Sequence, residues 1–181
     1  MNTIDQYQAV VSSCKDVYLK KAKDYGTSWR VYRTISIADQ IYIKAWRIRQ
    51  IQESGVQKIE DSIESEFMAI VNYGLMALIQ LTLDKDAKTY LSLEEAERYY
   101  DIQAKVVREL MLQKNHDYGE AWRALSQESF VDLMLTKILR IRQILANDGK
   151  TIVSEGIDAN FSDIVNYAVF ALIKLREPEL H

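Results

Sequence analysis

Apolar residues recur three or four positions apart along most of this chain, which is the spacing of one face of an α-helix. The pattern predicts three helices in the first half, over residues 3–23, 37–52 and 63–81. Four isoleucines fall on one side of the second of these helices: Ile37, Ile41, Ile48 and Ile51. The third stretch is apolar nearly all round, which predicts a central, buried helix.

The second half of the chain repeats the first. Three blocks recur in register: Asp24–Arg30 as Asp117–Arg123, Arg47–Ile51 as Arg140–Ile144, and Ile70–Tyr73 as Ile164–Tyr167. The first two blocks move by 93 positions and the third by 94, so the second copy has one more residue in the loop between them. We therefore predict an all-α fold, a tandem duplication of a three-helix module packed as a pseudo-twofold helical bundle.

The repeat also sets the boundaries. The first copy covers residues 1–83, a linker covers 84–92, and the second copy covers 93–181, with helices expected over 93–115, 130–147 and 159–175. Ser92 followed by Glu95 has the spacing of a capping box and predicts where the second copy's first helix begins. Gly26 and Gly119 closely follow the first helix of each copy, where glycine ends helices most readily.

Composition argues against two classes of partner, duplex nucleic acid and the membrane. A hydrophobic content of 48% is typical of a globular protein. A net charge of −3 argues against a face that binds duplex nucleic acid. The most apolar segment, residues 164–175, is too short to span a membrane. A single cysteine, Cys14, and no visible signal peptide predict a cytoplasmic location. There is no glycine-rich phosphate loop and no paired-cysteine metal motif.

Asn72 and Asn166 are the most informative polar residues, because each lies within an apolar run of the predicted central helix. A buried amide without hydrogen-bond partners costs a few kcal/mol, roughly, so something must bind it. Two interpretations stay open. Each amide either joins two helices as a satisfied core group or lies next to a bound ligand.

Acidic residues on the later helices of the second copy suggest a metal site. Asp163 lies three residues before Asn166 and therefore on the same helix face, whereas the first copy has Ala69 at this position. A carboxylate there needs Arg140, Lys137 or a divalent cation as its partner. Asp132 and Asp158, by contrast, correspond to acids in the first copy, Asp39 and Glu64. Oxygen ligands of this kind suit Mg²⁺, and we take Asp132, Asp158 and Asp163 as candidate ligands.

Basic pairs and an aromatic loop are repeated as well. Lys44 and Arg47, like Lys137 and Arg140, are neighbours on one helix face. There they hold phosphate oxygens, pair with acids of the third helix, or form a solvated face. The loop after the first helix carries Tyr118 and Trp122, with Tyr25 and Trp29 in the first copy. Such rings either stack on a base or close the end of a helical bundle.

The block Lys21–Trp29, its repeat Lys114–Trp122, and Asp163–Ala168 resemble the nucleotide-modification-associated domain of phage and bacterial proteins, once per copy. More distantly, the last helix is similar to all-α nucleoside triphosphate pyrophosphohydrolases of the MazG and dimeric dUTPase type. This resemblance implies a helical bundle that binds Mg²⁺ through carboxylates, while water releases pyrophosphate from a nucleotide. The chain departs from that pattern at Asn166, where the last metal-binding Asp is expected.

These observations predict a nucleotide-binding protein that acts either as a Mg²⁺-dependent pyrophosphohydrolase or as a non-catalytic module for ligand sensing or protein assembly. The partner would be a nucleotide or another small phosphate-bearing ligand, and the chain a monomeric pseudo-dimer or a homodimer. The residues expected to bind ligand are Lys114, Asp117, Tyr118, Trp122, Lys137, Arg140, Asn166 and Tyr167, with Lys44, Arg47 and Asn72 in the first copy. Because Asp163 corresponds to Ala69 in the first copy, we expect the site in the second copy.

Overall fold

The computed structural model describes residues 2–55, 62–84 and 87–177, which form six α-helices and two short 3-10 helices. The first copy contains α1 (Thr3–Tyr25), η1 (Ser28–Val31), α2 (Thr34–Ser54) and α3 (Ile63–Thr82). The second contains α4 (Leu93–Tyr118), η2 (Ala121–Ala124), α5 (Gln127–Ala146) and α6 (Ile157–Arg176). No strand occurs within the described ranges, and the all-α prediction is confirmed. Residues 85–86 of the predicted linker lie outside these ranges.

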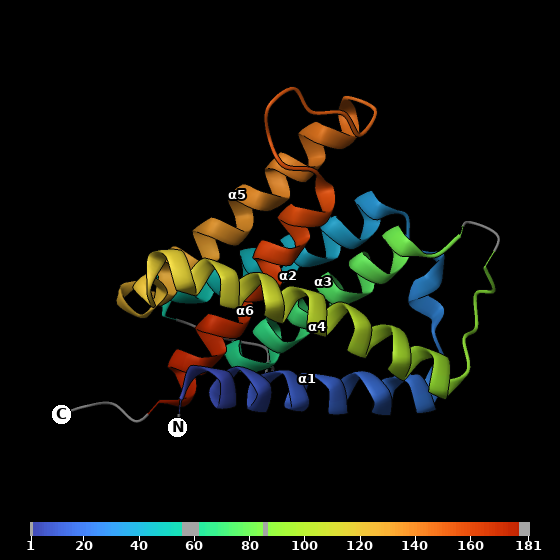
Figure 1. The fold of residues 1–181 in the computed structure, drawn as a ribbon, viewed down its shortest axis with the longest axis horizontal. Helices are drawn as coiled ribbons and strands as arrows, with labels where there is room; N and C mark the ends of the chain where they lie inside the picture. The colour runs from blue at the N-terminus through green and yellow to red at the C-terminus, as the bar shows by residue number, and fades with distance from the viewer. Residues whose placement is uncertain (1, 56–61, 85–86, 178–181) are drawn as a thin grey trace.

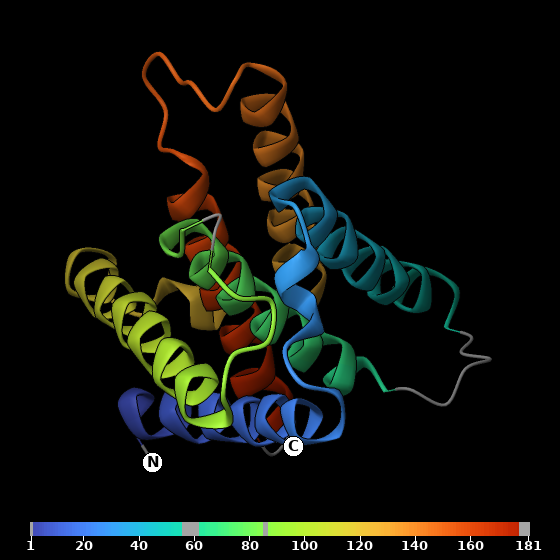
Figure 2. The same cartoon turned by 90° about the vertical axis from the view of Figure 1, so that its right-hand side faces the viewer.

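The third helices of the two copies, α3 and α6, pack against each other at the centre of the molecule, as their apolar character predicts. Figures 1 and 2 show α1 and α4 on one side of this pair and α2 and α5 on the other. Gly74 lies at the crossing, and a Cβ atom there would be 2.5 Å from Cγ2 of Val165. Each helix of one copy thus contacts its counterpart in the other, which gives the pseudo-twofold arrangement.

Local signals explain most helix ends. The capping box of Ser92 and Glu95 is present at the start of α4. Gly26 and Gly119 follow the first helices with φ angles of 72° and 62°, which other residues rarely adopt. The second helix of each copy begins three residues earlier than the apolar pattern predicts. In α5 the reason is Ser126, whose hydroxyl accepts a hydrogen bond from the Ser129 amide.

The two asparagines of the central helices join the copies. The Tyr7 hydroxyl donates to Oδ1 of Asn166 at 2.7 Å, and the Tyr100 hydroxyl donates to Oδ1 of Asn72 at 2.8 Å. Both amide nitrogens donate to carbonyls at equivalent positions of the first helices, Val107 at 3.3 Å and Cys14 at 2.9 Å. Both amides thus have the hydrogen-bond partners that the core-group interpretation predicts, and Asn72 also borders the cavity described below.

The second helices are joined by exposed ion pairs that follow the same symmetry. Arg142 of α5 contacts Asp39 of α2 at 2.9 Å, and Arg49 of α2 contacts Asp132 of α5 at 3.5 Å. The acid retained in both copies at this position therefore bridges the two halves of the molecule. No helix within the described residues is long and apolar enough to cross a membrane.

Candidate ligand site

A cavity of about 380 Å³ lies in the first copy, between α1, η1 and α3. Its walls are largely aromatic and thioether side chains, among them Tyr18, Trp29, Tyr32, Tyr73, Met68 and Met76. Lys21, Ser28, Ser65 and Asn72 add polar groups to the hydroxyls of the tyrosines. None of the described lining residues is acidic, so the cavity suits an aromatic, uncharged or anionic ligand.

Helical spacing brings these side chains to the cavity. Tyr18, Lys21 and Tyr25 lie three and four residues apart on α1 and therefore share one face. On α3, the residues Ala69 and Met76 are seven apart, two turns along the same face. Tyr25 is 55% exposed, which places it at the mouth.

The η1 segment that carries Trp29 is fixed in place by hydrogen bonds. The Thr27 hydroxyl donates to the Thr89 carbonyl at 2.7 Å and accepts from the Leu91 amide at 2.9 Å. Gln80 of α3 donates to the Tyr32 carbonyl at 3.0 Å. The linker and α3 thus hold the aromatic loop over the cavity, which gives Trp29 a defined position before any ligand binds.

In the first copy, one buried acid forms ion pairs with both cations of the second helix. Glu66 is 3% exposed and contacts Arg47 at 3.1 Å and Lys44 at 3.5 Å. The interpretation of Lys44 and Arg47 as partners of a third-helix acid is therefore confirmed. Lys21 forms no ion pair with any described residue, and this exposed lysine is among the residues that line the cavity.

The second copy differs at the corresponding place. Asp163 is 5% exposed and contacts Lys114 at 2.7 Å and Lys137 at 2.9 Å. Burial alone would lower the pKa of Lys114, but the hydrogen bond and charge of Asp163 outweigh it and raise that pKa. Lys137, one of the two cations that the sequence offered to Asp163, is thus its partner, together with Lys114.

The aromatic loop of the second copy is also filled from within. The Phe170 ring stacks on Trp122 with centroids 4.2 Å apart and planes 5° from parallel. Phe170 occupies the position of Met76 in the first copy. For Trp122, the interpretation as a residue that closes the end of the bundle is confirmed, whereas Tyr118 is 77% exposed.

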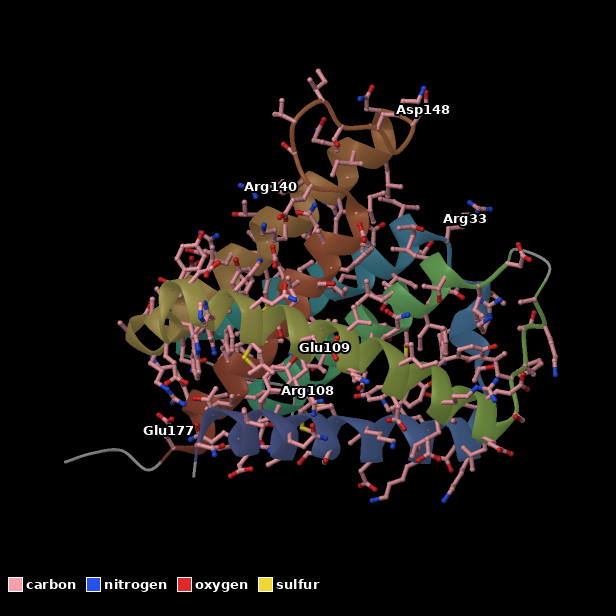
Figure 3. All side chains as sticks on the ribbon, viewed as in Figure 1. Arg33, Arg108, Glu109, Arg140, Asp148 and Glu177 are labelled. Atoms are coloured by element: carbon pink, nitrogen blue, oxygen red, sulfur yellow. The ribbon has the colours of Figure 1, made fainter. Side chains whose placement is uncertain are left out.

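The buried acid has moved by one helical turn between the copies. Glu66 corresponds to Asn160, and Asp163 corresponds to Ala69. Each copy has three equivalent cations near this acid: Lys21, Lys44 and Arg47 in the first, and Lys114, Lys137 and Arg140 in the second. The cation that does not pair with the buried acid is Lys21 in the first copy and Arg140 in the second. Arg140 is exposed on α5, at the edge of the bundle (Figure 3), and borders an open groove against the loop before α6.

The three acids proposed as metal ligands lie apart. Asp132 pairs with Arg49, Asp158 is exposed in the first turn of α6, and Asp163 is held by two lysines. Within the part of the chain that the structure describes, no group of three His, Cys, Asp or Glu side chains is placed to hold a metal ion. As the structure places them, Asp132, Asp158 and Asp163 do not fit a Mg²⁺ site.

The other residues expected to bind ligand also lie in different parts of the molecule. Asn166 lies at the junction between the copies, and Asp117 is exposed beside His116. Tyr167 is half-buried, and burial, then the charge of Asp163, raises its pKa. Asn72 alone among the proposed ligand-binding residues lines the first-copy cavity.

Sequence reasoning missed Glu66, Tyr32, Met68 and Met76 because it weighted positions that are identical in the two copies, and these four differ between them. The informative positions are those where the copies differ, such as Met76, which corresponds to Phe170. Such a difference indicates that side-chain volume or charge differs between the copies while the backbone is the same. Comparison of the two repeats in the sequence is enough to find these positions.

A family model described as nucleotide modification associated domain 1 matches the chain twice, at residues 21–81 and 114–175. The chain belongs to this family. The duplication and the recognised block are thereby confirmed, and membership gives the chain a role connected with nucleotides. The first match begins at Lys21 and covers η1 and nearly all of α3, hence most of the cavity wall. No curated protein and no solved structure matches the chain.

Proposed function

We propose that this chain binds a nucleotide in the first-copy cavity. One observation carries the proposal: the first of the two segments that match the family model forms most of an aromatic cavity whose described lining includes one lysine and no acid. A planar base gains from stacking on aromatic rings, by roughly 1–3 kcal/mol per base. A phosphate gains from a charge-assisted hydrogen bond to an ammonium group.

The proposal is limited to binding. The acids of the described residues are engaged in ion pairs or lie apart, so no carboxylate set is available to orient Mg²⁺ and an attacking water. Hydrolysis to release pyrophosphate, which the more distant resemblance implies, has no counterpart in this geometry. Mg²⁺ enters the test below as a companion of the nucleotide's own phosphates.

Thermal unfolding in the presence of nucleosides and nucleotides, with and without Mg²⁺, tests the proposal. A ligand at a hundred times its dissociation constant stabilises the folded chain by about 2.7 kcal/mol. We expect such a shift for at least one nucleotide. A non-catalytic assembly module would show none with any of them, and that result would overturn the proposal.

A matched pair of variants locates the binding. Ala69→Asp places a carboxylate opposite Lys21, as the second copy does with Asp163 and Lys114, and we expect it to abolish the shift. Ala9→Asp makes the same substitution at an exposed position of α1 and should leave the shift unchanged. An equal loss in both variants, or in neither, would place the nucleotide elsewhere.

A further inference from the structure

The contacts of Lys114 and Trp122 in the second copy indicate which ligand groups would fit beside their equivalents in the first copy, Lys21 and Trp29. In the second copy, the carboxylate of Asp163 pairs with Lys114, and the ring of Phe170 stacks on Trp122. Both side chains come from the same helix, seven residues apart. The second copy therefore contains, from its own chain, an anion and an aromatic ring held by the equivalents of Lys21 and Trp29.

The first copy lacks both groups and keeps the positions that bind them. Ala69 has only a methyl group and no carboxylate to pair with Lys21, and Met76 in place of a phenylalanine leaves space beside Trp29. Two turns of helix separate these positions, a rise of roughly 10 Å. A free base or inorganic phosphate is shorter than this, whereas a ring and an anion joined through a sugar are of that length.

The supply of positive charge limits the ligand to one phosphate. Lys21 is the one cation among the described residues that line the cavity. The neighbouring Lys44 and Arg47 are held by the buried Glu66. A triphosphate would bring several negative charges to a single lysine, with aromatic Tyr25 as the next group at the mouth.

We propose that the first-copy cavity takes a nucleoside monophosphate, with its base on Trp29 and its phosphate at Lys21. This assignment rests on the proposed nucleotide binding and adds the ligand class and its orientation. Asp163 and Phe170 are then internal substitutes for the phosphate and the base. The chain has one copy that binds the ligand and one copy that carries an imitation of it.

Calorimetric titration of the full chain with the nucleosides, nucleoside monophosphates and nucleoside triphosphates of the four DNA bases tests this assignment. For the preferred base, we expect the monophosphate to bind about tenfold to a hundredfold more tightly than the nucleoside, the contribution of one charge-assisted hydrogen bond. The triphosphate should bind no more tightly than the monophosphate. A triphosphate bound tenfold more tightly would overturn the ligand class and leave nucleotide binding standing.

Two variants, Lys21→Ala and Met76→Phe, test the orientation, and Lys20→Ala is the control. Lys21→Ala should lower monophosphate affinity to that of the nucleoside while nucleoside affinity stays unchanged. Lys20→Ala, which removes an exposed lysine paired with Asp16, should change neither. Met76→Phe should cover Trp29 and weaken nucleoside and monophosphate alike. If Lys21→Ala weakens both ligands equally, the phosphate does not lie at Lys21. If no nucleoside or nucleotide binds the wild-type chain, the proposed function itself fails.

Discussion

The two copies share a backbone and differ at the place where a ligand would bind. In the first, Trp29 and Lys21 border a cavity, while in the second the equivalent Trp122 is covered by Phe170 and Lys114 is neutralised by Asp163. Few substitutions on one buried helix separate these states. Duplication thus lets one copy keep an open site while the other supplies a well-packed partner for it.

The junction teaches the opposite lesson, because there the copies are interchangeable. Tyr7 and Tyr100 make equivalent hydrogen bonds to the asparagine of the other copy. Such reciprocal contacts depend on both halves at once, so neither half can change alone. Symmetry persists where the copies hold each other and is lost where only one copy is needed.

The largest expected effect comes from making the second copy like the first. Asp163→Ala removes the partner of Lys137, whose side chain is only 12% exposed, and leaves a poorly solvated charge. Removing one member of a buried pair costs about 3–5 kcal/mol. We expect chemical denaturation to show a loss of this size. Glu64→Gln, at an exposed pair with Arg176, should cost under about 1 kcal/mol. Equal losses would mean that Asp163 has no special structural role.

A smaller and symmetric effect is expected at the junction. Tyr7→Phe and Tyr100→Phe keep the rings but leave a buried asparagine oxygen without its donor. Each should destabilise the chain by about 1–3 kcal/mol, by similar amounts for the two copies. Tyr90→Phe, at a residue 64% exposed, is the control and should be neutral. A large difference between the two junction variants would contradict the reciprocal arrangement.

Alkaline pH should weaken the same junction. Burial raises the pKa of the Cys14 thiol to about 12, and it also raises the pKa of the Tyr7 and Tyr100 hydroxyls. The unfolded chain loses these protons at about pH 8.5 for a thiol and about pH 10 for a phenol, so stability falls as pH rises above those values. For the thiol, the loss is roughly 1.4 kcal/mol at about pH 9.5.

Denaturation midpoints measured from pH 7 to pH 11 check this expectation. The wild-type midpoint should stay level near neutrality and begin to fall above about pH 8.5, whereas in Cys14→Ala the fall should begin nearer about pH 10. A wild-type midpoint that stays level up to pH 11 would contradict the burial of these groups.

The smallest effects belong to the exposed pairs between α2 and α5. Asp39→Asn breaks the contact with Arg142 at 2.9 Å, where both side chains are partly exposed. Its cost should be under about 1 kcal/mol and should diminish in high salt. Asp132→Asn is the counterpart in the second copy. An effect of either variant comparable to that of Asp163→Ala would mean that these pairs dominate the contact between copies.

Much of the fold could be predicted because the signals were local or repeated. The apolar runs place the central helices, the Ser92 capping box fixes the start of α4, and the repeat implies that the copies pack together. Helix starts were misplaced where a capping serine precedes the apolar pattern, as at Ser126. Propensity and periodicity are properties of short segments, and they suffice at this level.

The site could be predicted only in part, because cavity and charge depend on packing between distant segments. Sequence spacing marked the Lys21–Trp29 block, which borders the first-copy cavity, whereas it led us to expect the site in the second copy, beside Asp163. That carboxylate was taken as a metal ligand because nothing local shows that Lys114, 49 residues away, reaches it. Likewise, Phe170 and Trp122 meet only after α6 packs against η2.

The stoichiometry of nucleotide binding tests the central claim most directly. Calorimetric titration of the full chain with the nucleoside monophosphates should give one site per chain for the base that binds, although the module occurs twice. Ala69→Asp should remove that site, while Ala9→Asp should retain it. Two sites per chain, or one site that survives Ala69→Asp, would contradict the account, because the nucleotide would then bind where the structure shows the chain's own carboxylate and ring.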